Sequence, residues 1–311
     1  MINTGRFVTN PNKDEVKPNP QVSVITVNYN GLVDTCELID SLFNVISSVT
    51  FEIIVVDNAS NVNEAEILQI KYPQIITIRS EKNLGFSGGN NLGILRARGE
   101  YLFFLNNDTF VISDGFKSLI DNIELRPEIV AASPKIIFAD PGNIIQFAGY
   151  TPLSKLTLRN NSIGYGQLDD GRWDKPRLTP FLHGAAMIIK KSVIEKIGLM
   201  PEIYFLYYEE LDWSAAVTRA GFEMMYIPYC KVYHKDSGTI GIESPLQAFY
   251  MTRNRLLYAW RNIPGMTKWF SILYLLLILN SKICFLFFVK RKASLAKACI
   301  KGILAFIKMK K

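Results

Sequence analysis

Short segments that are apolar at successive positions, and that alternate with helical stretches, constrain the fold of this chain more than any other feature of its sequence. They run from Val22 to Val27, Glu52 to Val56, Ile75 to Arg79 and Tyr101 to Leu105. Strands buried on both faces that alternate with helices are typical of a parallel sheet covered by helices on each side. The sequence therefore predicts an α/β fold with a mostly parallel central sheet flanked by helices.

Polar residues follow these predicted strands. Asn28 and Asn30 come after the first strand, Asp57 after the second, and Asn106 to Asp108 after the fourth. Ligands of such sheets bind beyond the carboxyl ends of the strands, and an acidic side chain there suits a hard divalent cation. Asp and Asn also cap helices and begin turns, which is the alternative interpretation of Asp57 and Asp108.

A glycine-rich segment, NLGFSGGN from Asn83 to Asn90, follows the third predicted strand, and we expect it to be a loop. Exposed backbone amides together with a cation suit a diphosphate. The glycines have neither the position nor the spacing of a dinucleotide-binding fingerprint, and the sequence has no P-loop motif. Hydride transfer and ordinary P-loop nucleotide hydrolysis are therefore disfavoured.

A second acidic set, Glu209, Glu210 and Asp212, opens a predicted helix that ends before Gly221. Helix neighbours point about 100° apart, so only one of Glu209 and Glu210 faces a pocket squarely. Such a carboxylate is a candidate general base, and the alternative is an acidic first turn that stabilises the helix. His234 ends a strand-like segment, where it is either a packed histidine or a metal ligand opposite Asp108.

Taken together, these motifs resemble the family 2 glycosyltransferases with GT-A fold, particularly their rhamnosyltransferase-like bacterial branch, from about Val22 to Arg261. The matching segments are VITVNYNG from Val24, VVDNAS from Val55, NLGF and GGNN from Asn83, LNNDT from Leu105, HGAAMIIKK from His183 and FLYYEELDW from Phe205. The resemblance implies a GT-A (Rossmann-like) sheet and transfer by single displacement with inversion.

The resemblance also implies roles for individual residues. Asp108 and His234 would hold Mg²⁺ or Mn²⁺, and Glu210 would be the general base, with Glu209 as its competitor and Asp212 in support. The implied nucleotide-sugar site consists of Val27, Asn28, Asn30, Asp57, Asn83, Gly85, Phe86, Gly89, Asn90, Asn107, Gly184 and Ala185. Two departures from the family pattern stand out, namely Asn106 and Asn107 at the metal motif, and a Glu-Glu pair in place of Glu-Asp.

The function implied is transfer of a sugar, with rhamnose favoured, from a UDP- or dTDP-sugar to a hydroxyl of a lipid-linked or cell-surface polysaccharide acceptor. A GT-A scaffold that binds carbohydrate or nucleotide without catalysis is the alternative, because the Asn residues at the metal motif leave fewer negative charges. A metal-dependent phosphatase is disfavoured, since the close Asp-x-Asp pair that such chemistry needs is missing.

Charged residues are distributed unevenly along the chain. Of its 35 Lys and Arg residues, 13 lie between Ser244 and Lys311, a stretch without Asp or Glu, which leaves 22 against 28 acidic residues before it. Because Phe, Leu, Ile and Trp accompany these basic residues, we expect an anionic membrane surface rather than nucleic acid as the partner.

The tail contains a nearly uninterrupted apolar run from Trp269 to Val289, about as long as a membrane crossing. A buried core helix is the alternative. Basic clusters flank both ends, and Asn280 to Lys282 interrupt the middle, so we expect two shorter helices in the membrane interface. A basic amphipathic helix should follow, with Lys297, Lys301, Lys308 and Lys311 on one side and Leu295, Ile303 and Phe306 opposite.

These features predict a flexible segment over residues 1–20, a catalytic domain over 21–262 and a membrane-associated tail over 263–311. The first 21 residues have no apolar core of a secretory leader or an anchor. The four cysteines form no closely spaced pair, which fits a reducing compartment. We therefore expect the protein at the cytoplasmic face of the cell membrane, as a peripheral or monotopic protein.

Overall fold

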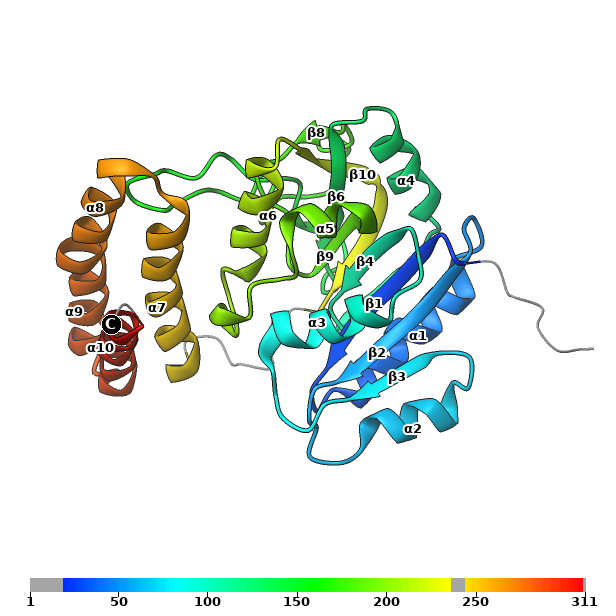
Figure 1. The fold of residues 1–311 in the computed structure, drawn as a ribbon, viewed down its shortest axis with the longest axis horizontal. Coiled ribbons are helices and arrows are strands. Elements are labelled where there is room, and N and C mark those ends of the chain that lie inside the picture. The colour runs from blue at the N-terminus through cyan, green and yellow to red at the C-terminus, as the bar shows by residue number, and fades with distance from the viewer. Residues whose placement is uncertain (1–18, 236–243, 310–311) are drawn as a thin grey trace, which may run out of the picture.

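A computed structural model describes residues 19–235 and 244–309 of the chain (Figure 1). Most of the predicted flexible segment, residues 1–18, lies outside the described residues, as does Lys311.

The fold is built on one ten-stranded sheet, whose main path runs β3-β2-β1-β4-β9-β6-β10-β5. The first four strands of this path are parallel, as predicted, whereas β9 is antiparallel to both of its neighbours, so the whole sheet is mixed. The strands are β1 (Val22–Asn28), β2 (Phe51–Asp57), β3 (Ile76–Arg79), β4 (Tyr101–Leu105), β5 (Thr109–Phe110), β6 (Ile129–Phe138), β7 (Ile144–Phe147), β8 (Arg177–Leu178), β9 (Ala186–Lys190) and β10 (Glu223–His234).

Helices cover both faces of the sheet, which confirms the predicted α/β class. Successive strand residues serve opposite faces: Val24 packs in one core with α1 and α4, and Ile25 packs in the other with α3 and α6. The helices of this part are α1 (Leu32–Val45), α2 (Glu64–Lys71), α3 (Gly85–Arg96), α4 (Phe116–Glu124), α5 (Lys191–Ile197) and α6 (Glu209–Arg219), with a short 3₁₀ turn over Glu202–Tyr204.

The glycine-rich segment is a helix and not the predicted loop. Its glycines let α3 lie directly on β1, because a Cβ on Gly89 would come within 2.8 Å of Val27 Cγ1 and one on Gly93 within 2.4 Å of Ile25 Cγ2. This close packing outweighs the poor helix propensity of glycine.

The C-terminal helices stand together beside the sheet (Figure 1): α7 (Pro245–Asn262), α8 (Gly265–Tyr274), α9 (Asn280–Val289) and α10 (Ala293–Lys308). A π-helical turn over Leu275–Leu279 joins α8 to α9. One helix from Gly265 to Val289 therefore replaces the two shorter helices that we expected. The polar residues do not end it, since Ser281 Oγ donates to Leu276 O within the helix and Lys282 is exposed.

The surfaces of these helices differ. The helix from Gly265 to Val289 is long and apolar enough to cross a membrane, and only 22% of its most apolar stretch is buried. In α10, Leu295 and Phe306 are buried while Lys297, Lys301 and Lys308 are exposed, which confirms the predicted amphipathic pattern. The apolar side of α10 packs against α7.

Candidate active site

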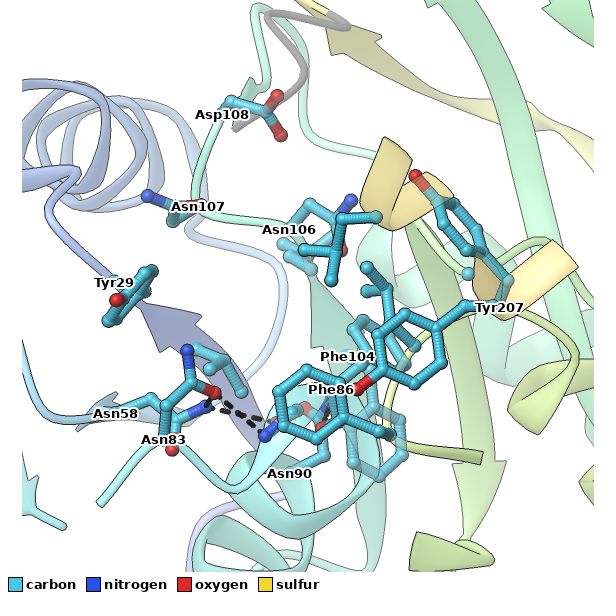
Figure 2. Close-up of a pocket in the computed structure, with 18 of the residues that line it drawn as sticks. Tyr29, Asn58, Asn83, Phe86, Asn90, Phe104, Asn106, Asn107, Asp108 and Tyr207 are labelled. Carbon is cyan, nitrogen blue, oxygen red and sulfur yellow. Dashed lines mark hydrogen bonds between the residues drawn. The ribbon is translucent and has the colours of Figure 1, made fainter. Parts of the chain in front are cut away.

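A cavity of about 640 Å³ lies at the carboxyl ends of β1 and β4 (Figure 2). It contains nine of the residues that the sequence assigned to a site: Val27, Asn83, Gly85, Phe86, Asn90, Asn107, Asp108, Gly184 and His234. Its other lining residues are Tyr29, Asn58, Phe104, Leu105, Asn106, Phe205, Leu206, Tyr207, Leu246 and Tyr250. We call this space the main pocket.

Asp108 and His234 meet at one end of the main pocket. The short strand β5 pairs antiparallel with the end of β10, with Thr109 opposite His234, and this register brings Asp108 Oδ1 to 3.2 Å from His234 Nε2. Gln146 Oε1 lies 2.8 Å from His234 Nδ1. The His234 tautomer with its hydrogen on Nδ1 donates to this oxygen and leaves the Nε2 lone pair facing the Asp108 carboxylate.

Two acceptors facing each other at this distance repel unless a proton or a cation lies between them. The donor set of one carboxylate and one imidazole, oriented by Gln146, therefore fits a divalent metal ion. Over residues 19–235 and 244–309, no group of three or more His, Cys, Asp or Glu side chains is arranged to hold a metal. Any ion at Asp108 and His234 must complete its coordination from outside these side chains.

Asn58 and Asn83 lie at the opposite end of the main pocket (Figure 2). Their side chains are joined, because Asn58 Nδ2 donates to Asn83 Oδ1 at 3.1 Å and to Gly85 O at 3.0 Å. Tyr29, which follows β1 and is 37% exposed, also lines the pocket. Flat amide groups beside an aromatic ring suit a nucleobase.

Asp57, which the resemblance placed in the nucleotide-sugar site, does not line the main pocket. Its carboxylate is fully buried and accepts hydrogen bonds from the backbone of Ser60 and Ala65 and from the Arg79 guanidinium. Neighbouring residues at a strand end point to opposite sides, so Asn58 rather than Asp57 faces the pocket.

Asn28 and Asn30 are also supporting residues rather than lining residues. Asn28 is fully buried and bonds Glu64 Oε2 at 2.6 Å and Thr35 Oγ1 at 2.9 Å. Asn30 has a φ of 53° and accepts a hydrogen bond from the Asn61 backbone at 2.8 Å. Both fix the turn that carries Tyr29.

The amides at the start of α3 are not free to bind a diphosphate, contrary to the prediction. The N–H groups of Leu84, Gly85 and Phe86 donate to Asn58 Oδ1, Asn83 Oδ1 and Phe205 O at 2.8–2.9 Å. Gly89 packs on Val27, and Ala185 is buried, with its carbonyl accepting from Asn106 N. These two residues shape the pocket from behind.

The acidic helix α6 begins beside the main pocket. A Cβ placed on Gly184 would lie 3.7 Å from Glu210 Cγ, so the Glu210 side chain lies next to this lining residue. Burial raises the pKa of the Glu210 carboxyl to about 7. Burial and the nearby Glu210 charge raise the pKa of Glu209 well above its ordinary value. Glu209 is 3% exposed and its Oε2 has no hydrogen-bond partner among the described residues, so a negative charge there would be poorly compensated.

The Asp212 side chain lines a second cavity rather than the main pocket. Its buried carboxylate accepts from Arg261 Nε at 2.6 Å, and Arg219, Arg261 and the end of α7 line the same cavity. It therefore ties α6 to α7, and its support of Glu210 is indirect.

Sequence reasoning missed the wall formed by Phe205 to Tyr207 and by Leu246 and Tyr250 of α7. Phe205 stacks on Tyr250 with ring centroids 5.2 Å apart. The aromatic run before Glu209 was visible in the sequence, but nothing in the pattern of α7 indicated that its first turns reach the pocket.

Comparisons with known proteins agree with this geometry. The model of the family described as Glycosyl transferase family 2 matches residues 23–198. The chain is 31% identical over 245 residues to the low-salt glycan biosynthesis hexosyltransferase Agl10 of Haloferax volcanii, covering 76% of this chain and 74% of that protein. It is 23% identical over 263 residues to the dTDP-rhamnosyl transferase RfbF of Shigella flexneri, covering 78% and 81%.

Among solved structures, the mannosyltransferase PcManGT from Pyrobaculum calidifontis in complex with GDP-Man and Mn²⁺ has a similar fold, with a TM-score of 0.57 at 14% identity over 97% of this chain and 92% of that one. Some matched proteins are much longer, since the chain covers only 25% and 20% of two further relatives.

Proposed function

Because the chain belongs to glycosyl transferase family 2 and is therefore a glycosyltransferase that uses a nucleotide-sugar donor, we propose that it is an inverting, metal-dependent enzyme. The donor would be a UDP- or dTDP-sugar, with rhamnose favoured. The acceptor would be a hydroxyl of a lipid-linked or cell-surface polysaccharide, at the cytoplasmic face of the membrane.

The donor would lie along the main pocket. Asn58, Asn83 and Tyr29 suit the nucleoside end, and Asp108 and His234 suit a cation at the diphosphate end. Mg²⁺ or Mn²⁺ bound by these two residues would stabilise the negative charge that develops on the diphosphate leaving group. Asn107 lies between the two ends (Figure 2), and its Nδ2 is held at 3.2 Å from Thr35 Oγ1.

Glu210 carries the proposal. It is the carboxylate next to Gly184 of the main pocket, and a pKa of about 7 leaves a large fraction ionised near neutral pH. It would take the proton of the acceptor hydroxyl as that oxygen attacks the anomeric carbon from the face opposite the leaving group. Glu209 stays neutral and keeps a second charge away from this site.

The rhamnosyl preference is supported by the likeness to the dTDP-rhamnosyl transferase RfbF. Membrane association is supported by the apolar side chains exposed along α8 and α9, such as Trp269, Phe270, Leu277 and Phe285, and by the basic residues that flank them. Such a protein would meet an acceptor carried on a lipid at the membrane surface.

The alternative is a GT-A scaffold that binds nucleotide sugar without turnover. One observation favours it: Asn106 and Asn107 stand beside Asp108, so the proposed metal site has few negative charges. A panel of nucleotide sugars, with Mn²⁺ and with or without membrane extract, distinguishes the two. Binding followed by metal-dependent release of nucleoside diphosphate supports the enzyme, and binding without release in every combination supports the scaffold.

A further inference from the structure

The backbone before the acidic helix has an unusual conformation. Phe205, Tyr207 and Tyr208 have φ values of 65°, 68° and 76°, in the left-handed region that non-glycine residues rarely adopt. Tyr208 is also the residue that precedes the first turn of α6. Such a conformation persists only where the surroundings hold it.

Asn254 of α7 makes three of the hydrogen bonds that hold this conformation. Its side chain is fully buried, and its Nδ2 lies 3.0, 2.7 and 2.8 Å from the carbonyl oxygens of Tyr204, Leu206 and Tyr207. The two hydrogens of the Asn254 amide are therefore shared among three carbonyl oxygens. Leu206 and Tyr207 belong to no helix or strand. Removing the Asn254 amide would take a hydrogen bond from each of these three carbonyls.

Arg253 adds a charged contact beside it. Arg253 Nη2 donates to Tyr204 O at 2.5 Å and to Ile203 O at 3.1 Å, and its guanidinium lies 4.7 Å from the centre of the Tyr250 ring. The other side of the loop rests on α3, where Phe86 N donates to Phe205 O at 2.8 Å. The loop is thus held between α7 and α3.

The opposite side of α7 is held by α10. A Cβ on Gly302 would come within 2.7 Å of Phe249 O and 3.2 Å of Arg253 N, so the two helices touch backbone to backbone behind the residues that hold the loop. A larger side chain at Gly302 should therefore displace α7, although Gly302 itself does not line the main pocket.

We propose that Arg253 and Asn254 are positioning residues of the glycosyl transfer reaction: they hold residues 203–208 in the one conformation that both closes the main pocket and aims Glu210 at it. The expected effect on turnover rests on the proposed function. The expected effect on the conformation of residues 203–208 does not. The start of the C-terminal helices thereby takes a direct part in building the catalytic site.

The test compares Asn254→Ala with Thr252→Ala, a control that is buried on the same helix but faces α10. Backbone amides of residues 205–212 should exchange with deuterium faster in Asn254→Ala and at the wild-type rate in Thr252→Ala. Turnover of the nucleotide sugar that the wild type uses best should fall by about 10- to 100-fold in Asn254→Ala, since a displacement of about 1 Å at a catalytic group has that effect. The Kd of the donor should change much less than the turnover rate.

A pH profile separates positioning from a general loss of folded protein. Glu209 and Tyr150 are the described groups whose pKa values the Glu210 charge raises, and the Arg253 charge lowers that of Glu209. Releasing the loop should let water reach Glu210, so the acid limb of turnover should move to lower pH in Asn254→Ala. A smaller amount of correctly folded enzyme would lower the rate and leave the limb in place.

Two further variants keep the test decisive if Asn254→Ala does not fold. Arg253→Met should show the same changes to a smaller extent, and Gly302→Val should produce them from behind α7. Unchanged exchange over residues 205–212 together with an unmoved acid limb in a folded variant would overturn the proposal. If the wild type turns over no donor, the proposed function fails, while the exchange measurement still decides whether α7 holds the loop.

Discussion

The ionisation of Glu210 gives a prediction with a defined pH and a defined size. Burial moves its pKa from 4.5 to about 7. If Glu210 is the general base, turnover at saturating donor should follow its ionised fraction, so the rate at pH 6 should be about a tenth of the plateau reached above about pH 8. Glu210→Gln should remove the base and lower turnover by about 10²- to 10⁴-fold, with donor binding retained.

The same shift affects stability. Since burial raises the folded-state pKa, the neutral carboxyl favours the folded protein. This contribution is complete below the unfolded pKa and is lost as the pH rises through about 7. A shift of this size corresponds to about 3 kcal/mol, so Glu210→Gln should be more stable than the wild type at pH 8 by an amount of that order and similar to it at pH 4.5.

The assay measures initial rates of nucleoside diphosphate release between about pH 5.5 and 8.5, with donor binding measured at each pH as a control for the metal site. Denaturant unfolding of both proteins at about pH 4.5 and about pH 8 measures the stability difference. A flat rate profile, or a Glu210→Gln variant that keeps more than about a tenth of wild-type turnover, refutes the assignment of Glu210 as the base.

Other predictions test the remaining parts of the site. Asp108→Ala should lose the Mn²⁺ dependence of donor binding, and a metal titration identical to that of the wild type would remove Asp108 from the site. Asn58→Ala should weaken donor binding, whereas Asp57→Ala should lower the melting temperature and change donor binding much less, because Asp57 is buried on the other side of the strand end; equal losses of donor binding in the two variants would contradict the distinction. Gly93→Val should destabilise the protein by about 1–3 kcal/mol in denaturant unfolding, since its side chain would overlap Ile25, and a neutral result would mean that α3 can move away from β1.

The chain order of strands and polar strand ends allowed the fold class and much of the pocket to be predicted. Asp108 was expected opposite His234 because the first follows a predicted strand and the second ends one, and the β5 and β10 register does bring them into contact. The pattern did not reveal which of two polar neighbours faces the pocket, and Asp57 was assigned to the site because the family resemblance implied it. Only the Asp57 contacts with Arg79 and Ser60 decide the question.

Composition misled the prediction where packing overrides local preference. The glycines from Gly85 to Gly93 indicated a loop, yet they permit a helix to lie on β1. In the tail, the polar residues from Asn280 to Lys282 indicated a break, but a π-helical turn and the Ser281 contact to the backbone keep the helix continuous. For α3 the deciding neighbour, β1, lies outside the local sequence, whereas in the tail the deciding contact lies within it.

The backbone contact between Gly302 and α7 means that α10 is not an independent appendage. Tyr204 and Tyr208, which precede Glu209, share a core with Leu256 of α7 and Phe306 of α10. An unrelated amphipathic helix in place of α10 would not rebuild this core. Swapping tails between relatives should therefore succeed only when α7 is exchanged together with α10.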